Sequence, residues 1–203
     1  MSHDTPRRHS VVTRDTRETQ IQVELTLDGT GKTSISTGIG FLDHMLTAWA
    51  YHGAFDLSLT CEGDLHIDQH HTVEDCGIAL GQAILEAVRP RTQLVRYGFW
   101  LLPMDETLAR VALDLSGRAF LHFEVPWHPQ LGAGTYDYHL TREFFWGVAR
   151  AAHMTLHVDV VTPGNNHHMC EAVFKGFGRA LRGAVQIDPA RPAGEIPSTK
   201  GDL

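Results

Sequence analysis

The sequence has few cysteines, no long hydrophobic run and no excess of positive charge. Its three cysteines, Cys61, Cys76 and Cys170, are an odd number without the spacing of a disulfide framework, which favours a reducing cytoplasm. No apolar stretch approaches the roughly 20 residues that a membrane helix needs, and the N-terminus lacks the apolar core of a secretory signal. The formal charge of −7 argues against nucleic acid as the main partner. We therefore expect a cytoplasmic protein with neither a membrane nor a nucleic-acid partner.

The composition is globular, with an unusual amount of histidine. The 203 residues are 42% hydrophobic and 20% charged, which suits one domain or two small fused halves. Five of the 14 histidines fall in the motifs described below. The first dozen residues are polar and charged, and we expect them to form a loose arm.

Hydrophobic periodicity predicts the same order of elements twice. In the first half we expect strands at 20–27, 33–38 and 55–60, the first two joined by a hairpin turn, and helices at 41–50 and 70–88. In the second half we expect strands at 99–102, 107–115, 119–125 and 155–161, and helices at 143–152 and 167–185. The tail after the last helix is rich in proline and glycine and should have little regular structure.

The two long helices repeat each other at an offset of 97 residues. Seven of 19 aligned positions are identical, and the polar identities are clustered near the helix starts. This internal duplication predicts an α+β fold of two pseudo-symmetric halves, residues 1–92 with the N-terminal arm and residues 93–203 with the tail, forming one structural domain. Each half would be a ββαβα-type unit with its helices packed on a mixed or antiparallel sheet.

Each long helix begins with the motif HHxxE, whose residue types suit metal binding. His70 and Glu74 lie one turn apart on the same face of a helix, whereas His71 points about 100° away. One motif can therefore contribute to two metal ions, and the second copy, with His167, His168 and Glu171, does the same. Four imidazoles and two carboxylates suit Mn²⁺, Fe²⁺ or Zn²⁺. A lone His pair at a helix start is more often a cap or a surface feature, but two copies at equivalent positions favour metal binding.

Three other functions fit parts of this pattern. A dinuclear metal hydrolase could use the same motifs to activate water, but the Asp-rich bridging pattern expected of a phosphoesterase is missing. A metal storage protein would carry its histidines in a flexible tract instead of at two helix starts. A third alternative is an oligomer that uses metal only structurally. Variants of Glu18, a charged residue just before the first predicted strand, and of the C-terminal tail with Lys200 would then be silent.

The chain closely resembles the imidazoleglycerol-phosphate dehydratase family of histidine biosynthesis. The resemblance runs from about Arg17 to the C-terminus, and rests on the two HHxxE motifs together with TGIGFLDHML, RYG, DLSGR, TLHV and IPSTKG. It implies a lyase that converts imidazoleglycerol phosphate to imidazole acetol phosphate and water. It also implies two manganese ions per active site and a homo-oligomer of 24 subunits that needs metal to assemble.

The resemblance further implies a set of metal ligands. Seven of them match motif by motif: His44, His70, His71, Glu74, His167, His168 and Glu171. The eighth is often the histidine of an EHFF motif in this family; here that stretch reads REFF and has Glu143 at the ligand position. Glutamate can also ligate Mn²⁺. His139, one turn earlier, and His157 of TLHV remain alternatives.

The resemblance also assigns residues to the substrate. Glu18 matches the family's acid/base glutamate, and the resemblance suggests that it reaches the active site of a neighbouring subunit. Lone basic residues are usually solvated, but here each lies in a stretch that matches the family. The residues that match the family's phosphate-binding set are Arg96, Arg118, Lys175, Ser198, Thr199 and Lys200. Such cations and hydroxyl donors are what a phosphate group requires.

These roles suggest a mechanism. We hypothesise that the substrate imidazole binds between the two ions as an imidazolate. The electron-rich ring would expel the hydroxyl group to give a diazafulvene-like intermediate. Glu18 would then act as the general acid/base for the carbon-bound proton, on the way through an enol to the ketone.

Overall fold

The computed structural model describes residues 8–129 and 136–201 of the chain. The first half consists, in order, of β1 (His9–Asp15), β2 (Thr19–Thr26), β3 (Thr33–Ser36), α1 (Gly40–Gly53), β4 (Asp56–Gly63) and α2 (His70–Ala87). The second half consists of β5 (Tyr97–Met104), β6 (Thr107–Asp114), β7 (Phe120–Glu124), α3 (Leu140–Ala151), β8 (Thr155–Thr162) and α4 (Asn166–Ala184).

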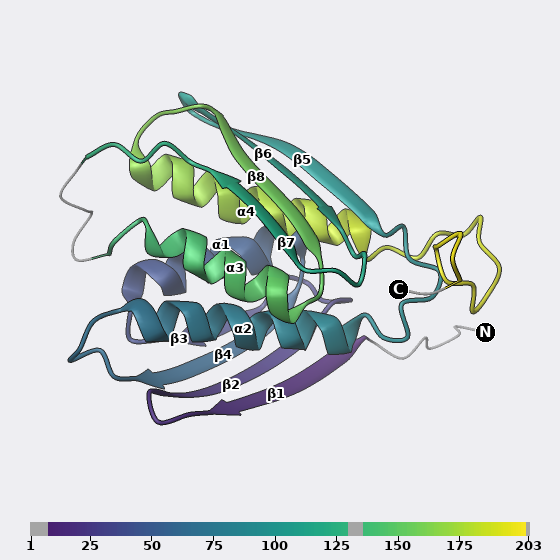
Figure 1. The fold of residues 1–203 in the computed structure, drawn as a ribbon, viewed down its shortest axis with the longest axis horizontal. Coiled ribbons are helices and arrows are strands. Elements are labelled where there is room, and N and C mark those ends of the chain that lie inside the picture. Colours follow the sequence, from purple (N-terminus) through teal and green to yellow (C-terminus); the bar gives the residue numbers. More distant parts are fainter. Residues whose placement is uncertain (1–7, 130–135, 202–203) are drawn as a thin grey trace.

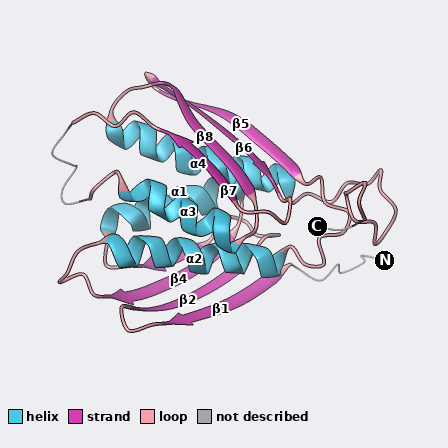
Figure 2. Cartoon of the chain, in the orientation of Figure 1, coloured by secondary structure: helices cyan, strands magenta, loops and turns pink. Residues whose placement is uncertain are grey.

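Each half forms one four-stranded mixed sheet. The strand orders are β1-β2-β4-β3 and β5-β6-β8-β7, so the two sheets have the same topology. In each sheet the last strand of this order pairs in parallel with its neighbour, and the other pairs are antiparallel. The helices lie between the two sheets (Figure 1 and Figure 2). The duplicated α+β fold is confirmed, and each half has one strand more than the ββαβα unit.

Side-chain alternation explains why the sheets pack on the helices. In β2, Ile21, Val23 and Leu25 are buried, while Gln20 and Gln22 are exposed on the other face. Buried residues of both halves belong to one continuous hydrophobic core. All three cysteines are buried and free. Buried free cysteines pack as small hydrophobic residues. No helix in the described part of the chain is long and apolar enough to span a bilayer.

The helices of the two halves cross each other at glycines. A Cβ atom at Gly81 of α2 would lie 2.6 Å from the carbonyl oxygen of Val148 in α3. Its repeat counterpart, Gly178 of α4, would place a Cβ atom 2.4 Å from the carbonyl oxygen of Trp49 in α1. Each half therefore packs a helix tightly against the other half. The boundary at 92/93 falls between α2 and β5, and the single domain stays a prediction.

The expectation of a loose arm over the first dozen residues is wrong where the structure describes them. Residues 9–15 form β1, which pairs with β2 along its whole length. Val12 is buried in the core, and the Ser10 hydroxyl donates to the carbonyl oxygen of Ala83 at 2.8 Å. Arg14 adds an ion pair to Asp75 of α2 at 2.8 Å, so backbone pairing and several side-chain contacts fix this strand, although most of its side chains are polar. Residues 1–7 lie outside the described residues.

The predicted hairpin between the first two expected strands is also wrong. β3 pairs in parallel with β4, and the second neighbour of β2 is β4. The connecting loop is held across the start of β4 because the Asp56 carboxylate accepts the backbone N–H groups of Thr30 at 2.8 Å and Lys32 at 3.0 Å. Gly29 permits this approach, since a Cβ atom there would lie 2.3 Å from the Asp56 nitrogen.

Candidate metal centre

Two imidazoles and a carboxylate converge between α1 and α4. The Nε2 atoms of His167 and His44 lie 3.0 Å and 3.5 Å from Oε2 of Glu171. The three potential ligand atoms lie within 4.8 Å of one another. His44 comes from the first half of the chain and the other two residues come from the second. This His44–His167–Glu171 group, which we call the first cluster, is therefore assembled across the duplication.

Local structure fixes the first cluster. The side chain of Asn165 accepts the backbone N–H of His167 at 2.8 Å and caps the start of α4. In the following turns His167 and Glu171 are four residues apart and share one face. The ring of Phe41 packs edge-on against the His167 imidazole, with ring centroids 5.3 Å apart.

Glu171 is held as a carboxylate. Burial raises its pKa, but the Lys175 ammonium, at 2.6 Å from Oε1, and then His44 and His167 outweigh it and keep the pKa below the usual range. Lys175, expected among the phosphate-binding residues, thus lies beside the first cluster. An ionised carboxylate beside two imidazoles suits a hard or borderline divalent cation.

The first HHxxE motif divides its histidines between two places. Nε2 of His70 lies 3.5 Å from Oε2 of Glu74. The ring of His71 lies at 82° to that of His70, with its Nδ1 2.9 Å from Oδ2 of Asp64. Asp64 raises the pKa of His71, first through this hydrogen bond. On the other side of the ring, Nε2 of His71 lies 3.8 Å from Glu18.

The second motif also separates its histidines. The rings of His167 and His168 lie at 84°, and Nδ1 of His168 is 3.0 Å from Oε2 of Glu106. Glu106 also accepts the backbone N–H of Asn165 at 2.6 Å. This N–H and then His168 lower the pKa of Glu106 to about 2. Asp105, Glu106 and His168 offer ligand atoms within 4.8 Å of one another. No role was expected for Asp64, Asp105 or Glu106, because their contacts arise only in the folded chain.

The candidates for the eighth ligand lie in different surroundings. Glu143 is in the first turn of α3, with its carboxylate 3.2 Å from the Arg142 guanidinium. His139 immediately precedes α3 and is exposed. His157 is exposed on β8 and stacks on His122 of β7 at 5.4 Å. None of the three joins a group of converging ligands among the residues described.

Most of the expected phosphate-binding residues lie near the C-terminal end of α4, whereas the first cluster lies at its N-terminal end. The backbone N–H of Arg96 donates to Ala184, the last residue of α4, at 2.8 Å. His167 lies 17 residues earlier on that helix, about 25 Å away at 1.5 Å per residue. Nη1 of Arg96 donates to the Pro197 carbonyl at 2.7 Å and so ties the tail to the same end (Figure 1).

Apart from Lys175, the other members of the set are on or near this end. Gly117, next to the exposed Arg118, lines a cavity with Leu85 and Arg89 at the end of α2. In the tail, the Ser198 hydroxyl accepts the Lys200 backbone N–H at 3.2 Å. The side chains of Thr199 and Lys200 are exposed.

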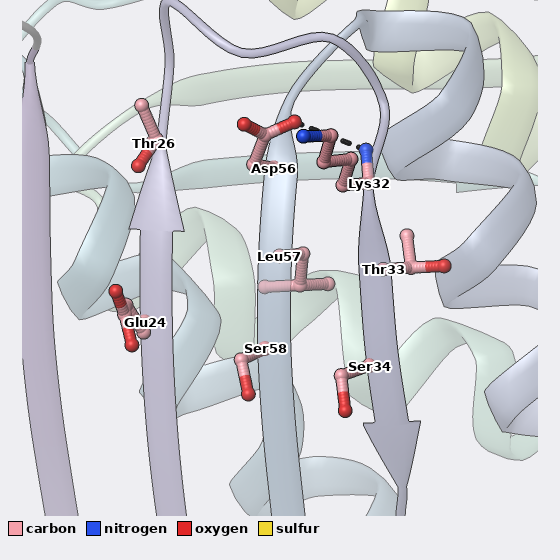
Figure 3. A pocket seen from close by; sticks show the side chains of 8 residues that line it. All are labelled: Glu24, Thr26, Lys32, Thr33, Ser34, Asp56, Leu57 and Ser58. Atoms are coloured by element: carbon pink, nitrogen blue, oxygen red, sulfur yellow. Dashed lines mark hydrogen bonds between the residues drawn. The ribbon is translucent and has the colours of Figure 1, made fainter.

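A separate cavity of about 250 Å³ lies on the outer face of the first sheet. Figure 3 shows its lining of hydroxyls and charges, including Glu24, Lys32, Asp56 and Ser58. It contains no histidine, so the motif residues are not gathered there. A cavity of about 390 Å³ does include His70, together with Asp68, Gln69, Asp137 and Leu140.

Comparison with known proteins gives one consistent result. The family model described as imidazoleglycerol-phosphate dehydratase matches residues 37–181. Imidazoleglycerol-phosphate dehydratases of Polaromonas sp. and Ralstonia nicotianae are each 55% identical over 196 residues, covering 97% of this chain and 94% and 99% of theirs.

Solved structures agree with the sequence relatives. The Staphylococcus aureus imidazoleglycerol-phosphate dehydratase superposes with a TM-score of 0.79 at 40% identity, covering 88% of this chain and 99% of its own. The Pyrococcus furiosus enzyme in complex with (S)-C348 gives 0.80 at 36% identity, covering 95% and 100%. The chain therefore belongs to the imidazoleglycerol-phosphate dehydratase family, and it is an enzyme of the carbon–oxygen lyase class.

Proposed function

We propose that this chain dehydrates imidazoleglycerol phosphate to imidazole acetol phosphate in cytoplasmic histidine biosynthesis, using two Mn²⁺ ions per active site. The observation that carries the proposal is the first cluster, in which His44, His167 and Glu171 converge from both halves of the chain. Its mixed imidazole and carboxylate donors fit Mn²⁺, and three ligands leave open positions on an octahedral ion.

The duplication supports a second ion held by His70, Glu74 and Glu143. Gly81 and Gly178 are repeat counterparts, and they cross α3 and α1 at Val148 and Trp49. Positions 49 and 148 differ by 99, and so do 44 and 143. Glu143 is thus the packing counterpart of His44, which favours it over His139 and His157 as the eighth ligand.

His71 and His168 are then left for ions held mainly by other subunits. Both point away from their neighbours in the motif, and three ligands from one chain do not complete an octahedral site. Glu18 accompanies His71 at 3.8 Å, so the two would enter a neighbouring active site together. This arrangement makes activity depend on assembly.

The distance between candidate sites also supports an oligomer. The start of α4 and Arg96 are about 25 Å apart, too far for one small phosphate ester to touch both. The cations near Arg96 must therefore serve an active site whose first cluster belongs to another chain. The outer face of β5 exposes Tyr97, Phe99 and Leu101, which suits self-association. The resemblance implies 24 subunits.

We assign separate roles in the reaction to the metal ligands, to Glu18 and to the phosphate-binding residues. When bound, the two ions supply positive charge that stabilises an anionic imidazole ring. Glu18 moves the proton on the reacting carbon. The phosphate group is held by Arg96, Arg118, Lys175, Ser198, Thr199 and Lys200.

The direct test uses metal-stripped protein and imidazoleglycerol phosphate, with and without Mn²⁺. We expect imidazole acetol phosphate only with metal, and assembly measured by light scattering to follow metal addition. Parallel reactions with Fe²⁺ and Zn²⁺ compare the candidate ions. Protein with a proven content of two Mn²⁺ per chain that forms no product would refute the proposed reaction.

A further inference from the structure

We propose that Asp64 and Glu106 are positioning residues, which fix the rings of His71 and His168 so that Nε2 of each faces a metal ion. The inference rests on the proposed function only in taking these two histidines as metal ligands. It assigns roles to two carboxylates outside the expected ligand set, and it explains why Glu18 remains available for proton transfer.

The hydrogen bonds select one form of each imidazole. Asp64 lies 2.9 Å from Nδ1 of His71, and Glu106 lies 3.0 Å from Nδ1 of His168. An ionised carboxylate only accepts hydrogen bonds, so Nδ1 must carry the hydrogen. In the neutral ring the lone pair then belongs to Nε2. A carboxylate behind a histidine in this way sets its tautomer and orientation as a ligand.

Glu106 is itself held by a second hydrogen bond. Oε1 accepts the Asn165 backbone N–H at 2.6 Å, at the point where the chain enters α4. Glu106 thus links the turn between β5 and β6 to the start of the helix that carries His168. Because the same carboxylate contacts both the helix start and the ring, it fixes the direction of the ring relative to the helix.

The repeat shows that Glu106 and Glu18 are counterparts. Residues 18–25 read ETQIQVEL and residues 106–113 read ETLARVAL, and each glutamate precedes the second strand in the order of its sheet. The two have different surroundings. Glu106 is bound to Nδ1 of His168, whereas Glu18 faces Nε2 of His71 at 3.8 Å.

Asp64 accounts for this difference. Strand register pairs Gln20 with Glu62 and, beside a β-bulge, Leu108 with Thr162, so Asp64 and Gly164 each lie two residues beyond these pairs. A Cβ atom at Gly164 would lie 2.2 Å from Oε1 of Glu106. In the second half the Glu106 carboxylate therefore occupies the space beside residue 164, while in the first half residue 64 supplies the carboxylate itself. Glu18 is thereby released from holding His71.

The test measures binding of Mn²⁺ alone, by calorimetry and by the electron paramagnetic resonance signal of the free ion. We expect Asp64→Ala and Glu106→Ala each to weaken Mn²⁺ binding by about 10- to 100-fold, as for other outer partners of histidine ligands. Glu106→Gln keeps an acceptor oxygen and the shape of the side chain, and should recover part of the loss. Glu24→Ala, which removes an exposed carboxylate of β2 paired with His9, is the matched control and should change Mn²⁺ affinity by less than about twofold.

The outcomes separate the possibilities. Unchanged Mn²⁺ affinity in folded Asp64→Ala and Glu106→Ala proteins would overturn the inference. Loss of a whole equivalent of Mn²⁺ in Glu106→Gln, as severe as in Glu106→Ala, would make Glu106 a direct ligand and also overturn it. Since these measurements need no substrate, failure of the proposed dehydration would be seen separately in the product assay.

Discussion

Arg96 donates two hydrogen bonds to the Asp114 carboxylate, from Nε to Oδ1 at 2.7 Å and from Nη2 to Oδ2 at 3.0 Å. The Asp114 carboxylate raises the pKa of Arg96, chiefly through this contact, so the guanidinium stays charged. A third N–H group holds the Pro197 carbonyl. Of the five N–H groups of an arginine, two remain for a phosphate group.

The first prediction concerns this guanidinium and the tail it holds. Arg96→Ala and Lys200→Ala should raise KM for the phosphate substrate by about tenfold or more, and lower kcat less, because both remove charged hydrogen bonds to a non-reacting group. Arg110→Ala, which removes an exposed arginine paired with Asp159, is the control. Steady-state kinetics decide; a fall in kcat at constant KM would move Arg96 into the catalytic group.

The second prediction concerns proton transfer. Glu18→Gln should lower kcat by about 10²- to 10⁴-fold, the usual range for losing a general acid/base, while the protein still binds Mn²⁺. Glu24→Gln changes an exposed glutamate on β2, the strand that follows Glu18, and should be neutral. Full turnover by Glu18→Gln would rule out the acid/base role.

The third prediction concerns the eighth ligand. Glu143→Ala should weaken binding of one Mn²⁺ ion by about tenfold or more, and Glu143→His should restore it, because imidazole can replace the carboxylate. Arg142→Ala removes the guanidinium 3.2 Å from that carboxylate and should leave metal binding intact. Calorimetric titration gives both affinity and stoichiometry. If Glu143→Ala binds two ions normally, His139→Ala is the next variant to measure.

The fourth prediction concerns the helix crossings. Gly81→Ala and Gly178→Ala should each destabilise the fold by about 1–3 kcal/mol or more, since the new methyl group meets a backbone oxygen that cannot move alone. Gly183→Ala, on α4 with open space around it, should be neutral or stabilising by up to about 1 kcal/mol. Denaturant unfolding of the three variants measures the contrast. Equal stability of all three would contradict tight packing at these glycines.

Sequence pattern predicted the elements whose side chains alternate or repeat, and missed those fixed by other contacts. β1 contains adjacent Val11 and Val12 among polar residues, so no alternation announced a strand that pairs along its whole length with β2. The parallel pairing of β3 depends on Asp56, which binds the loop before β3 although it lies 24 residues after Lys32 in the sequence.

The site shows the same division. The HHxxE motifs could be found because their spacing is local, whereas Glu143 was assigned as a ligand only through the resemblance of REFF to the family's EHFF motif and stays a prediction. The partners of His71 and His168 could not be found from the sequence. Asp64 is separated from α2 by a loop, and Glu106 is 62 residues from His168. The repeated Glu-Thr pair at 18–19 and 106–107 was the one available signal.

The crossed helices also bear on how this chain arose. Because each half covers its helices with those of the other half, half a chain alone would leave two apolar helix surfaces open to water. The shorter ancestor that the duplication implies would therefore have been a homodimer, in which each subunit contributed the start of a helix to its partner. After fusion into one gene the two copies could change independently, and the counterpart positions 44 and 143 now hold a histidine and a glutamate.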